Sequence, residues 1–382
     1  MDFAPTPAQT GAAEKAKVLA RTHVAPGAAD REAAGRVEPE LLSAMGSHGL
    51  IAPELPAHLG GDGADRITAG LVTEEIAAGD VSAAYVQVVG SLVGQILAEH
   101  APPELARTWV RRLCSGQDLI GIGLTEPHAG SDAANLHLTA RREGDTYVLD
   151  GVKSLSFCGQ ASAAVLIART GPDRRRGRDI SAFLVPLDLP GVTREPYSDM
   201  GTKAVGRGAV HLDGVRVPAD HRLGPEGEGF SHVLQGFDFS RALIGLQCLG
   251  AARSSLEETW EYVGERTAFD RPLSTFQGVA FPLAEAETRL SAARLLCLRT
   301  LWLKDTGQPH TSEAAMCKWW APVVAHEIAQ QCLLLHGQYG YRTERPLEQR
   351  MRDVLGLQIG DGTAQIMKLV IARQRLGREL AP

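Results

Sequence analysis

Nine residues, LTEPHAGSD (124–132), carry more hydrogen-bonding chemistry than a simple turn needs. Thr125 and Ser131 supply hydroxyl groups that can both donate and accept hydrogen bonds. Gly130 has no side chain, so it lets a ligand approach the backbone closely. The stretch lies between an apolar, strand-like run and a second strand pattern. These residues predict either a polar turn or a loop that binds a flat, polar ligand.

A second stretch, IGDGTAQIM (359–367), places one carboxylate between two glycines, directly before a helical pattern. Asp is favoured in turns and at helix N-caps, so Asp361 can have a purely structural role. A carboxylate that is partly removed from water can instead act as a general base, because burial raises its basicity. The residues around Asp361 leave both interpretations open.

Three regions with different hydrophobic patterns must position these residues. The hydrophobic pattern of residues 1–118 is mainly that of helices. Residues 119–222 contain short runs rich in Val, Ile and Leu, separated by Gly, Pro and Asp, which is typical of an antiparallel sheet or small barrel. Residues 223–382 return to long helical patterns, of which 281–305 is the clearest. This order predicts an α+β protein with three domains at these boundaries.

The composition argues against several classes of protein. The 382 residues carry a net charge of −6, so we do not expect a nucleic-acid binder. No apolar run reaches the length of a membrane span, and the N-terminus lacks the apolar stretch of a signal peptide. We therefore expect a cytoplasmic protein that does not contact a membrane. We expect no metal site, since His310 and Glu313 have no partner ligands nearby in the sequence.

The cysteines show neither a CxxC motif nor the spacing of a zinc site. Several lie in apolar helical patterns, which favours buried free thiols and a reducing compartment. They are Cys114, Cys158, Cys248, Cys297, Cys317 and Cys332.

Four stretches together resemble the acyl-CoA dehydrogenase family of FAD flavoproteins. Besides LTEPHAGSD, they are DRPLSTFQ (270–277), HGQYGYRTERPLEQRMRDV (336–354) and GDGTAQIMKLVIAR (360–373). The resemblance covers nearly the whole chain, with the four stretches in the family's order. It implies an N-terminal helical domain, a middle antiparallel β domain and a C-terminal four-helix bundle. It also implies bound FAD and a homo-oligomer, either a dimer or a tetramer.

The resemblance assigns twelve residues to FAD. The loop at 124–132 would line the flavin ring and the pyrophosphate, and the segment at 266–277 would reach the FAD of a neighbouring subunit. The implied FAD-binding residues are Leu124, Thr125, Gly130, Ser131, Ser156, Phe157, Arg266, Phe269, Gln277, Gly337, Thr363 and Gln365. The chain departs from many relatives at Leu155 and Phe157, where they have Trp and Thr, and at Leu334, where Gln is usual.

The resemblance also gives Asp361 a chemical role, as the base that removes the α-proton of an acyl-CoA thioester. Many relatives have Glu at this position, and one branch places its base where this chain has Ser240, which cannot serve as one. The implied substrate-binding residues are Ser131, Ser240, Arg241 and Gly360. A displacement on the order of 1 Å can cost about a hundredfold in rate, so the shorter Asp suits a differently presented proton. We therefore expect the branch that acts on alicyclic thioesters such as cyclohexanecarboxyl-CoA.

The expected reaction is FAD-dependent dehydrogenation to an enoyl-CoA, with electrons passing to electron-transfer flavoprotein or a similar acceptor. Three alternatives stay open: an enzyme that acts on carrier-protein-bound acyl groups, a flavin oxidase of nitroalkanes, and a non-catalytic member of the family. The basic stretch DRRRGRD (173–179) has three interpretations. It is a contact for CoA phosphates, a contact for an acidic carrier protein, or a solvated run of charge.

Overall fold

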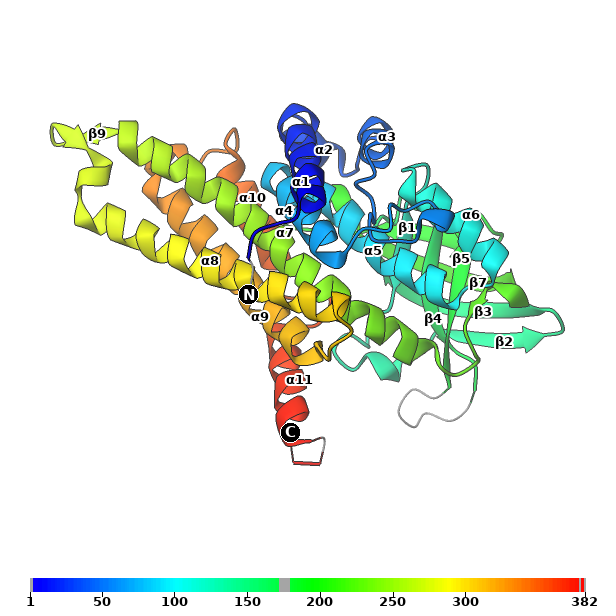
Figure 1. Cartoon of the computed structure of the whole chain (residues 1–382). Coiled ribbons are helices and arrows are strands. Elements are labelled where there is room, and N and C mark those ends of the chain that lie inside the picture. The colour runs from blue at the N-terminus through cyan, green and yellow to red at the C-terminus, as the bar shows by residue number, and fades with distance from the viewer. Residues whose placement is uncertain (1–2, 172–178, 378, 381–382) are drawn as a thin grey trace.

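In the computed structural model, which describes residues 3–171, 179–377 and 379–380, helices, strands and helices follow one another along the chain (Figure 1). The first helices are α1 (Pro7–Leu19), α2 (Ala28–Ala34), α3 (Pro39–Ser47), α4 (Arg66–Gly79), α5 (Val81–His100) and α6 (Pro103–Cys114). The strands are β1 (Ile120–Gly123), β2 (Thr139–Glu143), β3 (Thr146–Leu155), β4 (Ala163–Arg169), β5 (Ile180–Pro186), β6 (Val192–Pro196), β7 (Gly208–Pro218) and β8 (Arg222–Leu223). The last helices are α7 (Gly229–Glu265), α8 (Gln277–Asp305), α9 (Thr311–Leu335), α10 (Pro346–Gly356) and α11 (Ala364–Leu376), with a hairpin of β9 (Thr267–Ala268) and β10 (Arg271–Pro272) between α7 and α8. This architecture confirms the predicted α+β class; the basic stretch at 173–178 lies outside the described residues.

Helix α5 runs through the middle of the molecule, between the sheet and the last helices (Figure 1). Asp80 starts it, because its side chain accepts a hydrogen bond from the backbone N–H of Ser82 at 2.8 Å. By length and composition α5 could cross a membrane, but 83% of its apolar window is buried inside the protein. That burial is the pattern of a core helix.

The sheet runs in the order β6-β7-β3-β2-β4-β5-β8, and β1 pairs with β4 at its side. Most neighbours are antiparallel, as predicted, but β1 pairs with β4, and β2 pairs with β4, in parallel. The predicted antiparallel β domain therefore also contains parallel pairs, and the sheet is mixed. In the chain, β2 and β3 lie between β1 and β4, and β3 lies between β2 and β4. Partners separated by such a long connection can run in the same direction.

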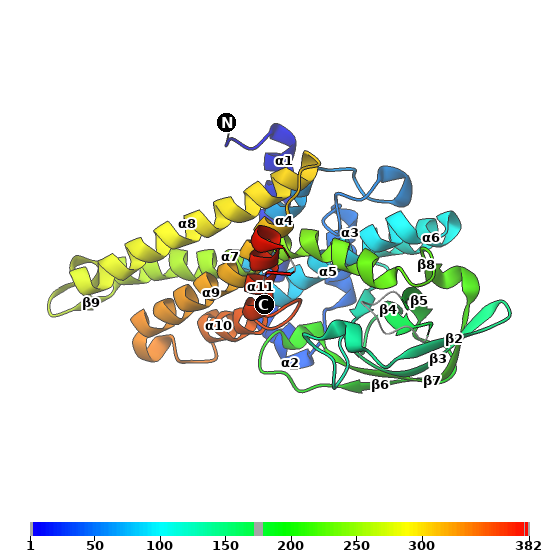
Figure 2. The ribbon, with the colours of Figure 1, turned by 90° about the horizontal axis from the view of Figure 1, so that it is seen from below.

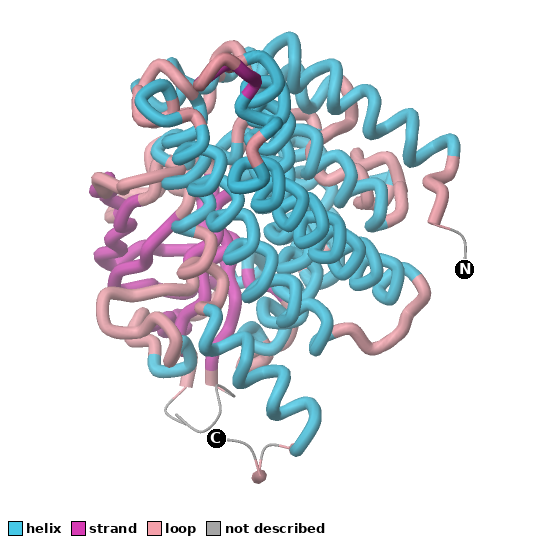
Figure 3. Tube along the Cα trace, turned by 90° about the vertical axis from the view of Figure 1, so that its left-hand side faces the viewer, coloured by secondary structure: helices cyan, strands magenta, loops and turns pink. Residues whose placement is uncertain are grey.

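Helices α7, α8 and α9 run side by side in the C-terminal bundle (Figure 2), and α10 and α11 each pack against α9. Helix α7 has 37 residues and packs against α4 and α5 as well as its bundle partners. Gly250 permits its contact with α4, since an added Cβ would lie 2.3 Å from the carbonyl oxygen of Glu74. The strands of the large sheet gather on one side of the molecule (Figure 3), whereas the β9–β10 hairpin lies at the far end of the helices (Figure 1).

All six cysteines fall within the described residues, and each is buried and free. The prediction of buried free thiols is confirmed. Four of them lie in the core of the bundle: Cys248, Cys297, Cys317 and Cys332.

Candidate active site

Asp361 lies in the turn between α10 and α11, with a left-handed backbone φ of +53°. Helix α11 is capped by Thr363, whose Oγ1 accepts a hydrogen bond from the N–H of Ile366 at 3.3 Å. The N-cap interpretation of Asp361 is therefore wrong, and its carboxylate is not used to start the helix. A non-glycine residue at positive φ is uncommon and tends to occur at functional sites.

Four side chains from four different elements surround the Asp361 carboxylate. They are Tyr85 on α5, Arg207 just before β7, Arg241 on α7 and Lys318 on α9. Burial raises the pKa of Asp361, and the cations of Lys318, Arg241 and Arg207 oppose that rise. Asp361 nevertheless keeps part of its surface accessible. A carboxylate with raised basicity that a ligand can still reach is suited to accept a proton.

Arg241 is held in place by Asp238, one helical turn earlier in α7. Its Nη1 donates to Asp238 Oδ1 at 2.7 Å, and Thr311 Oγ1 donates to the other carboxylate oxygen at 2.6 Å. The Nε of Arg241 is buried and has no hydrogen-bond partner among the described residues. The neighbouring Ser240 is fully buried, and its hydroxyl donates to the carbonyl oxygen of Phe237 at 3.3 Å. Arg241 thus offers a free donor beside Asp361, whereas Ser240 faces into the helix packing.

Tyr85 was not identified from the sequence. Every residue from Val81 to Gly94 is buried except Tyr85, which keeps accessible surface in the middle of the molecule. Its ring stands edge-on to Phe157 with 6.3 Å between centroids, and the Asp361 carboxylate adds to the burial that raises its pKa. Within the described chain its hydroxyl has no hydrogen bond. A single tyrosine in the small, apolar run VSAAYVQVV is the signal that could have revealed it.

The loop after β1 is fixed by one buried carboxylate. Glu126 accepts hydrogen bonds from Lys153 Nζ at 2.7 Å and from the N–H groups of His137 and Leu138 at 2.6 and 2.9 Å. Burial would raise the pKa of Glu126, but the hydrogen bond and the charge of Lys153 hold it below its usual value. The loop is thereby folded back on β2 and β3, with Leu124 partly buried and its polar residues directed outward.

The outward groups of this loop and of the β3–β4 turn fit a polar, flat cofactor. Thr125, Gly130 and Ser131 are exposed, and an added Cβ on Gly130 would meet open space. Ser156 is buried, and its Oγ has no partner among the described residues. Phe157 has a φ of +55° and is held by its N–H, which donates to the carbonyl oxygen of Val205 at 2.9 Å. An orphaned hydroxyl beside an exposed glycine loop is satisfied when a polar ligand binds there.

The remaining predicted residues fall into two groups. Gly360, Thr363 and Gln365 lie in or just after the Asp361 turn. Arg266, Phe269, Gln277 and Gly337 lie at the other end of the bundle, near β9, and are exposed (Figure 1). Phe269 is 88% exposed. One chain therefore does not bring this second group to Asp361.

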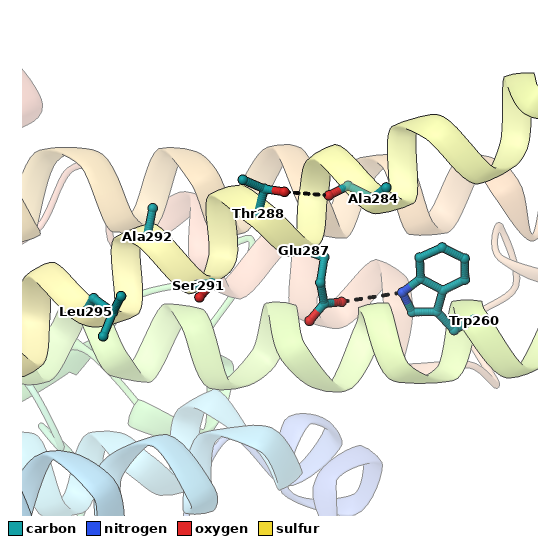
Figure 4. Close-up of a pocket in the computed structure, with 7 residues that line it drawn as sticks. All are labelled: Trp260, Ala284, Glu287, Thr288, Ser291, Ala292 and Leu295. Carbon is teal, nitrogen blue, oxygen red and sulfur yellow. Dashed lines mark hydrogen bonds between the residues drawn. The ribbon is translucent and has the colours of Figure 1, made fainter. Parts of the chain in front are cut away.

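A surface cleft of about 660 Å³ lies between α7 and α8, away from Asp361 (Figure 4). It is lined by Trp260, Ala284, Glu287, Thr288, Ser291, Ala292 and Leu295. Trp260 Nε1 donates to Glu287 Oε2 at 3.4 Å, and none of the residues predicted to act in chemistry lines the cleft. Among the described residues, no group of three or more His, Cys, Asp and Glu side chains is arranged to hold a metal ion.

Comparison with known proteins follows the three structural parts. Residues 6–117, 121–215 and 227–376 match the family profiles described as the N-terminal, middle and C-terminal domains of acyl-CoA dehydrogenase. The chain is 36% identical over 380 residues to the probable acyl-CoA dehydrogenase YngJ of Bacillus subtilis (strain 168), covering 98% of this chain and 100% of YngJ. It is 38% identical over 333 residues to the mitochondrial short-chain specific acyl-CoA dehydrogenase of Homo sapiens, covering 86% and 80%. The solved structure of butyryl-CoA dehydrogenase from Megasphaera elsdenii matches with a TM-score of 0.94 at 30% identity, covering 98% and 100%.

Proposed function

The chain belongs to the acyl-CoA dehydrogenase family, whose members depend on FAD, and from this premise we propose that it removes two hydrogens from the α- and β-carbons of a compact acyl-CoA thioester. The observation that carries the proposal is the Asp361 carboxylate, accessible yet set among Tyr85, Arg241 and Lys318. The product is the corresponding enoyl-CoA.

One chain offers three hydroxyl groups for contacts with the cofactor. Thr125 and Ser131 offer hydroxyls on the exposed loop, and Ser156 offers the buried hydroxyl that lacks a partner. These residues would hold FAD, which would supply the acceptor for the hydride that leaves the β-carbon of the substrate. The buried ring of Phe157 packs edge-on against Tyr85, so in this proposal it helps to exclude water from the site.

Asp361 accepts the α-proton in this proposal. Its basicity is set by burial, which raises its pKa, and by the cations that keep part of the carboxylate population ionised. The free Nε of Arg241 is the donor available for the carbonyl oxygen of the thioester, where negative charge develops as the proton leaves. The base comes from the turn between α10 and α11 and the donor comes from α7. Their spacing is set by α9, because α7, α10 and α11 all pack against it.

The acyl group is compact, in our proposal, because Tyr85 fills the position where α5 faces Asp361. A short straight chain and a ring that contains the α-carbon both satisfy this limit. We propose the alicyclic thioester cyclohexanecarboxyl-CoA as the finer choice, since the shorter Asp361 leaves room beside a branched α-carbon. Gly360 supports this choice, because nothing but one carbonyl oxygen, 3.9 Å away, lies near its missing side chain.

A second copy of the chain completes the cofactor site in this proposal. Arg266, Phe269 and Gln277 are exposed at the end of the bundle and cannot reach the Asp361 site of their own chain. A guanidinium suits a bidentate contact with a phosphate group of the cofactor of a neighbour. Helix α8 also presents apolar side chains to solvent, including Leu295, which is 47% exposed beside the cleft (Figure 4). Sedimentation of the purified protein as a monomer would contradict this oligomer.

The test is an anaerobic titration that follows the visible absorbance band of the flavin. Purified protein is titrated in parallel with cyclohexanecarboxyl-CoA, butyryl-CoA and octanoyl-CoA. Bleaching by the first two but not by octanoyl-CoA supports a compact acyl site, and stronger bleaching by the cyclic thioester supports the alicyclic proposal. The Asp361→Asn variant serves as the control: it should keep its flavin and reduce it about 10²–10⁴-fold more slowly.

Other outcomes separate the alternatives. A yellow protein that no CoA thioester bleaches would overturn the CoA substrate and favour a carrier-bound acyl group. Oxygen consumption with a nitroalkane and no added acceptor would favour an oxidase. Rapid reoxidation of the reduced protein by electron-transfer flavoprotein, but not by oxygen, is the result expected for the proposed acceptor.

A further inference from the structure

Lys318 is a fully buried lysine that forms no ion pair within the described chain. It lies on α9, in the run AAMCKWW, where its neighbours Ala315 and Cys317 are also buried. Burying an ammonium group is costly unless its hydrogen bonds are made. The position of Lys318 therefore requires an explanation beyond packing.

The ammonium group makes two hydrogen bonds, both to the turn that carries Asp361. Lys318 Nζ donates to the carbonyl oxygen of Leu357 at 2.6 Å and to that of Gly362 at 3.1 Å. These two carbonyls bracket residues 358–361. One side chain on α9 thus holds both ends of the segment that presents the candidate base.

The backbone that Lys318 holds is strained. Asp361 has a φ of +53° and Gly362 a φ of +101°, and the left-handed region is unfavourable for a non-glycine residue such as Asp361. Such a conformation persists only when its surroundings enforce it. The two charge-assisted hydrogen bonds of Lys318 are interactions of the required strength.

The same ammonium is coupled to the Asp361 carboxylate. After burial, which lowers the pKa of Lys318 to about 8, the largest influence on Lys318 is the charge of Asp361. Lys318 is in turn the cation that most strongly opposes the raised pKa of Asp361. Other groups face the pair as well: Arg241 and Cys248 from α7, Arg207 from the segment before β7, and Tyr85 from α5.

We infer that Lys318 is a positioning residue for Asp361: it clamps the turn that presents the carboxylate and keeps that carboxylate ionised for proton abstraction. The inference rests on the proposed function for its catalytic part. Its structural part, the clamp, stands on the two hydrogen bonds alone.

The first experiment tests the clamp without any turnover. Hydrogen exchange of the peptide spanning 356–363 is compared in wild type, Lys318→Met and Lys318→Arg. Loss of two hydrogen bonds from a charged donor should speed exchange in this peptide on the order of tenfold to a hundredfold in Lys318→Met. Lys318→Arg keeps the positive charge and the ability to donate hydrogen bonds, so hydrogen exchange of this peptide in Lys318→Arg should be closer to that in wild type. Equal exchange in wild type and Lys318→Met would overturn the clamp.

The second experiment tests the electrostatic part through the pH profile of kcat/KM. Removing the cation lets the pKa of Asp361 rise further, so the acid limb of the profile in Lys318→Met should move to higher pH by about one unit. The loss should fall on kcat more than on KM, because Lys318 does not touch the substrate. Lys318→Arg should restore the position of the limb. A reduced rate with an unmoved limb would overturn the electrostatic role and leave only a structural one.

Lys304→Met is the matched control. Lys304 is also a lysine whose pKa is lowered by burial, and its Nζ lies 5.6 Å from the ring centre of Phe239, but it has no bond to the Asp361 turn. This variant should leave both the exchange of 356–363 and the pH profile as in wild type. If wild type turns over no acyl thioester at all, the proposed function fails, whereas the exchange result still decides the clamp. If Lys318→Met does not fold, Lys318→Arg and Lys318→Gln are compared in its place, and equal pH profiles for these two would overturn the electrostatic role.

Discussion

Replacing Lys153 by Met should release the loop that presents Thr125 and Ser131. The Lys153–Glu126 pair is buried, with the two side chains 0% and 1% exposed and 2.7 Å between Nζ and Oε1. Removing one partner of such a pair leaves an uncompensated charge and costs about 3–5 kcal/mol. Since about 1.4 kcal/mol corresponds to a factor of ten, the opening of the loop becomes on the order of 10²–10⁴-fold more frequent.

Hydrogen exchange measures this opening directly, because the N–H groups of His137 and Leu138 donate to Glu126. Exchange in the peptide spanning 124–138 should accelerate by that factor in Lys153→Met, and the purified variant should lose flavin more readily than wild type. The double variant Glu126→Gln with Lys153→Met should recover most of the protection, since it removes both charges together.

A surface pair provides the matched control. Arg107 and Glu104 also lie 2.8 Å apart, but their side chains are 52% and 82% exposed. Arg107→Met should therefore change stability by no more than about 1 kcal/mol. The reasoning is refuted if Lys153→Met changes exchange no more than Arg107→Met does, or if the double variant is as poorly protected as the single one.

Two further changes test other parts of the site. Tyr85→Ala should let longer straight-chain thioesters such as octanoyl-CoA reduce the flavin. Tyr85→Phe keeps the ring and should retain the wild-type limit on chain length. Identical chain-length profiles for Tyr85→Ala and wild type would contradict the role of the ring. Burial and the nearby charge of Asp80 raise the pKa of Asp353 from its ordinary 3.8 to about 8. The Asp353 carboxyl therefore stabilises the folded state most at a pH below 3.8, and this stabilisation is lost as the pH rises toward 8. Asp353→Asn should therefore lose less thermal stability than wild type between pH about 5 and about 8, and parallel losses in the two proteins would speak against this assignment.

The order of the three regions could be predicted because hydrophobic period is a local property of the sequence. The parallel pairing of β1 and β2 with β4 could not, since the direction of a strand relative to a distant partner depends on how the chain returns to the sheet. The cap of α11 shows a related difficulty. Asp361 and Thr363 are both acceptable N-cap residues in sequence, and only the backbone conformation assigns that role to Thr363.

Only part of the site could be predicted from the sequence. Short stretches around Asp361 and Gly130 carry chemistry in consecutive residues, so they were found. Tyr85 and Lys318 acquire their roles from neighbours far away in the chain, and each looks like an isolated polar residue in an apolar helix. That isolation was itself the available signal, because a lone polar side chain in a buried helix needs a partner elsewhere.

The division of the site between structural parts has a consequence for how such a protein diverges. In the proposed function, the hydroxyls for the cofactor come from loops of the sheet, at Thr125 and Ser156, whereas the side chain proposed to limit the acyl group, Tyr85, comes from α5. A gene duplicate can therefore accumulate substitutions along one face of α5 and acquire a new substrate while its flavin loops stay under unchanged selection. Substrate range and cofactor binding can therefore change independently of each other during evolution.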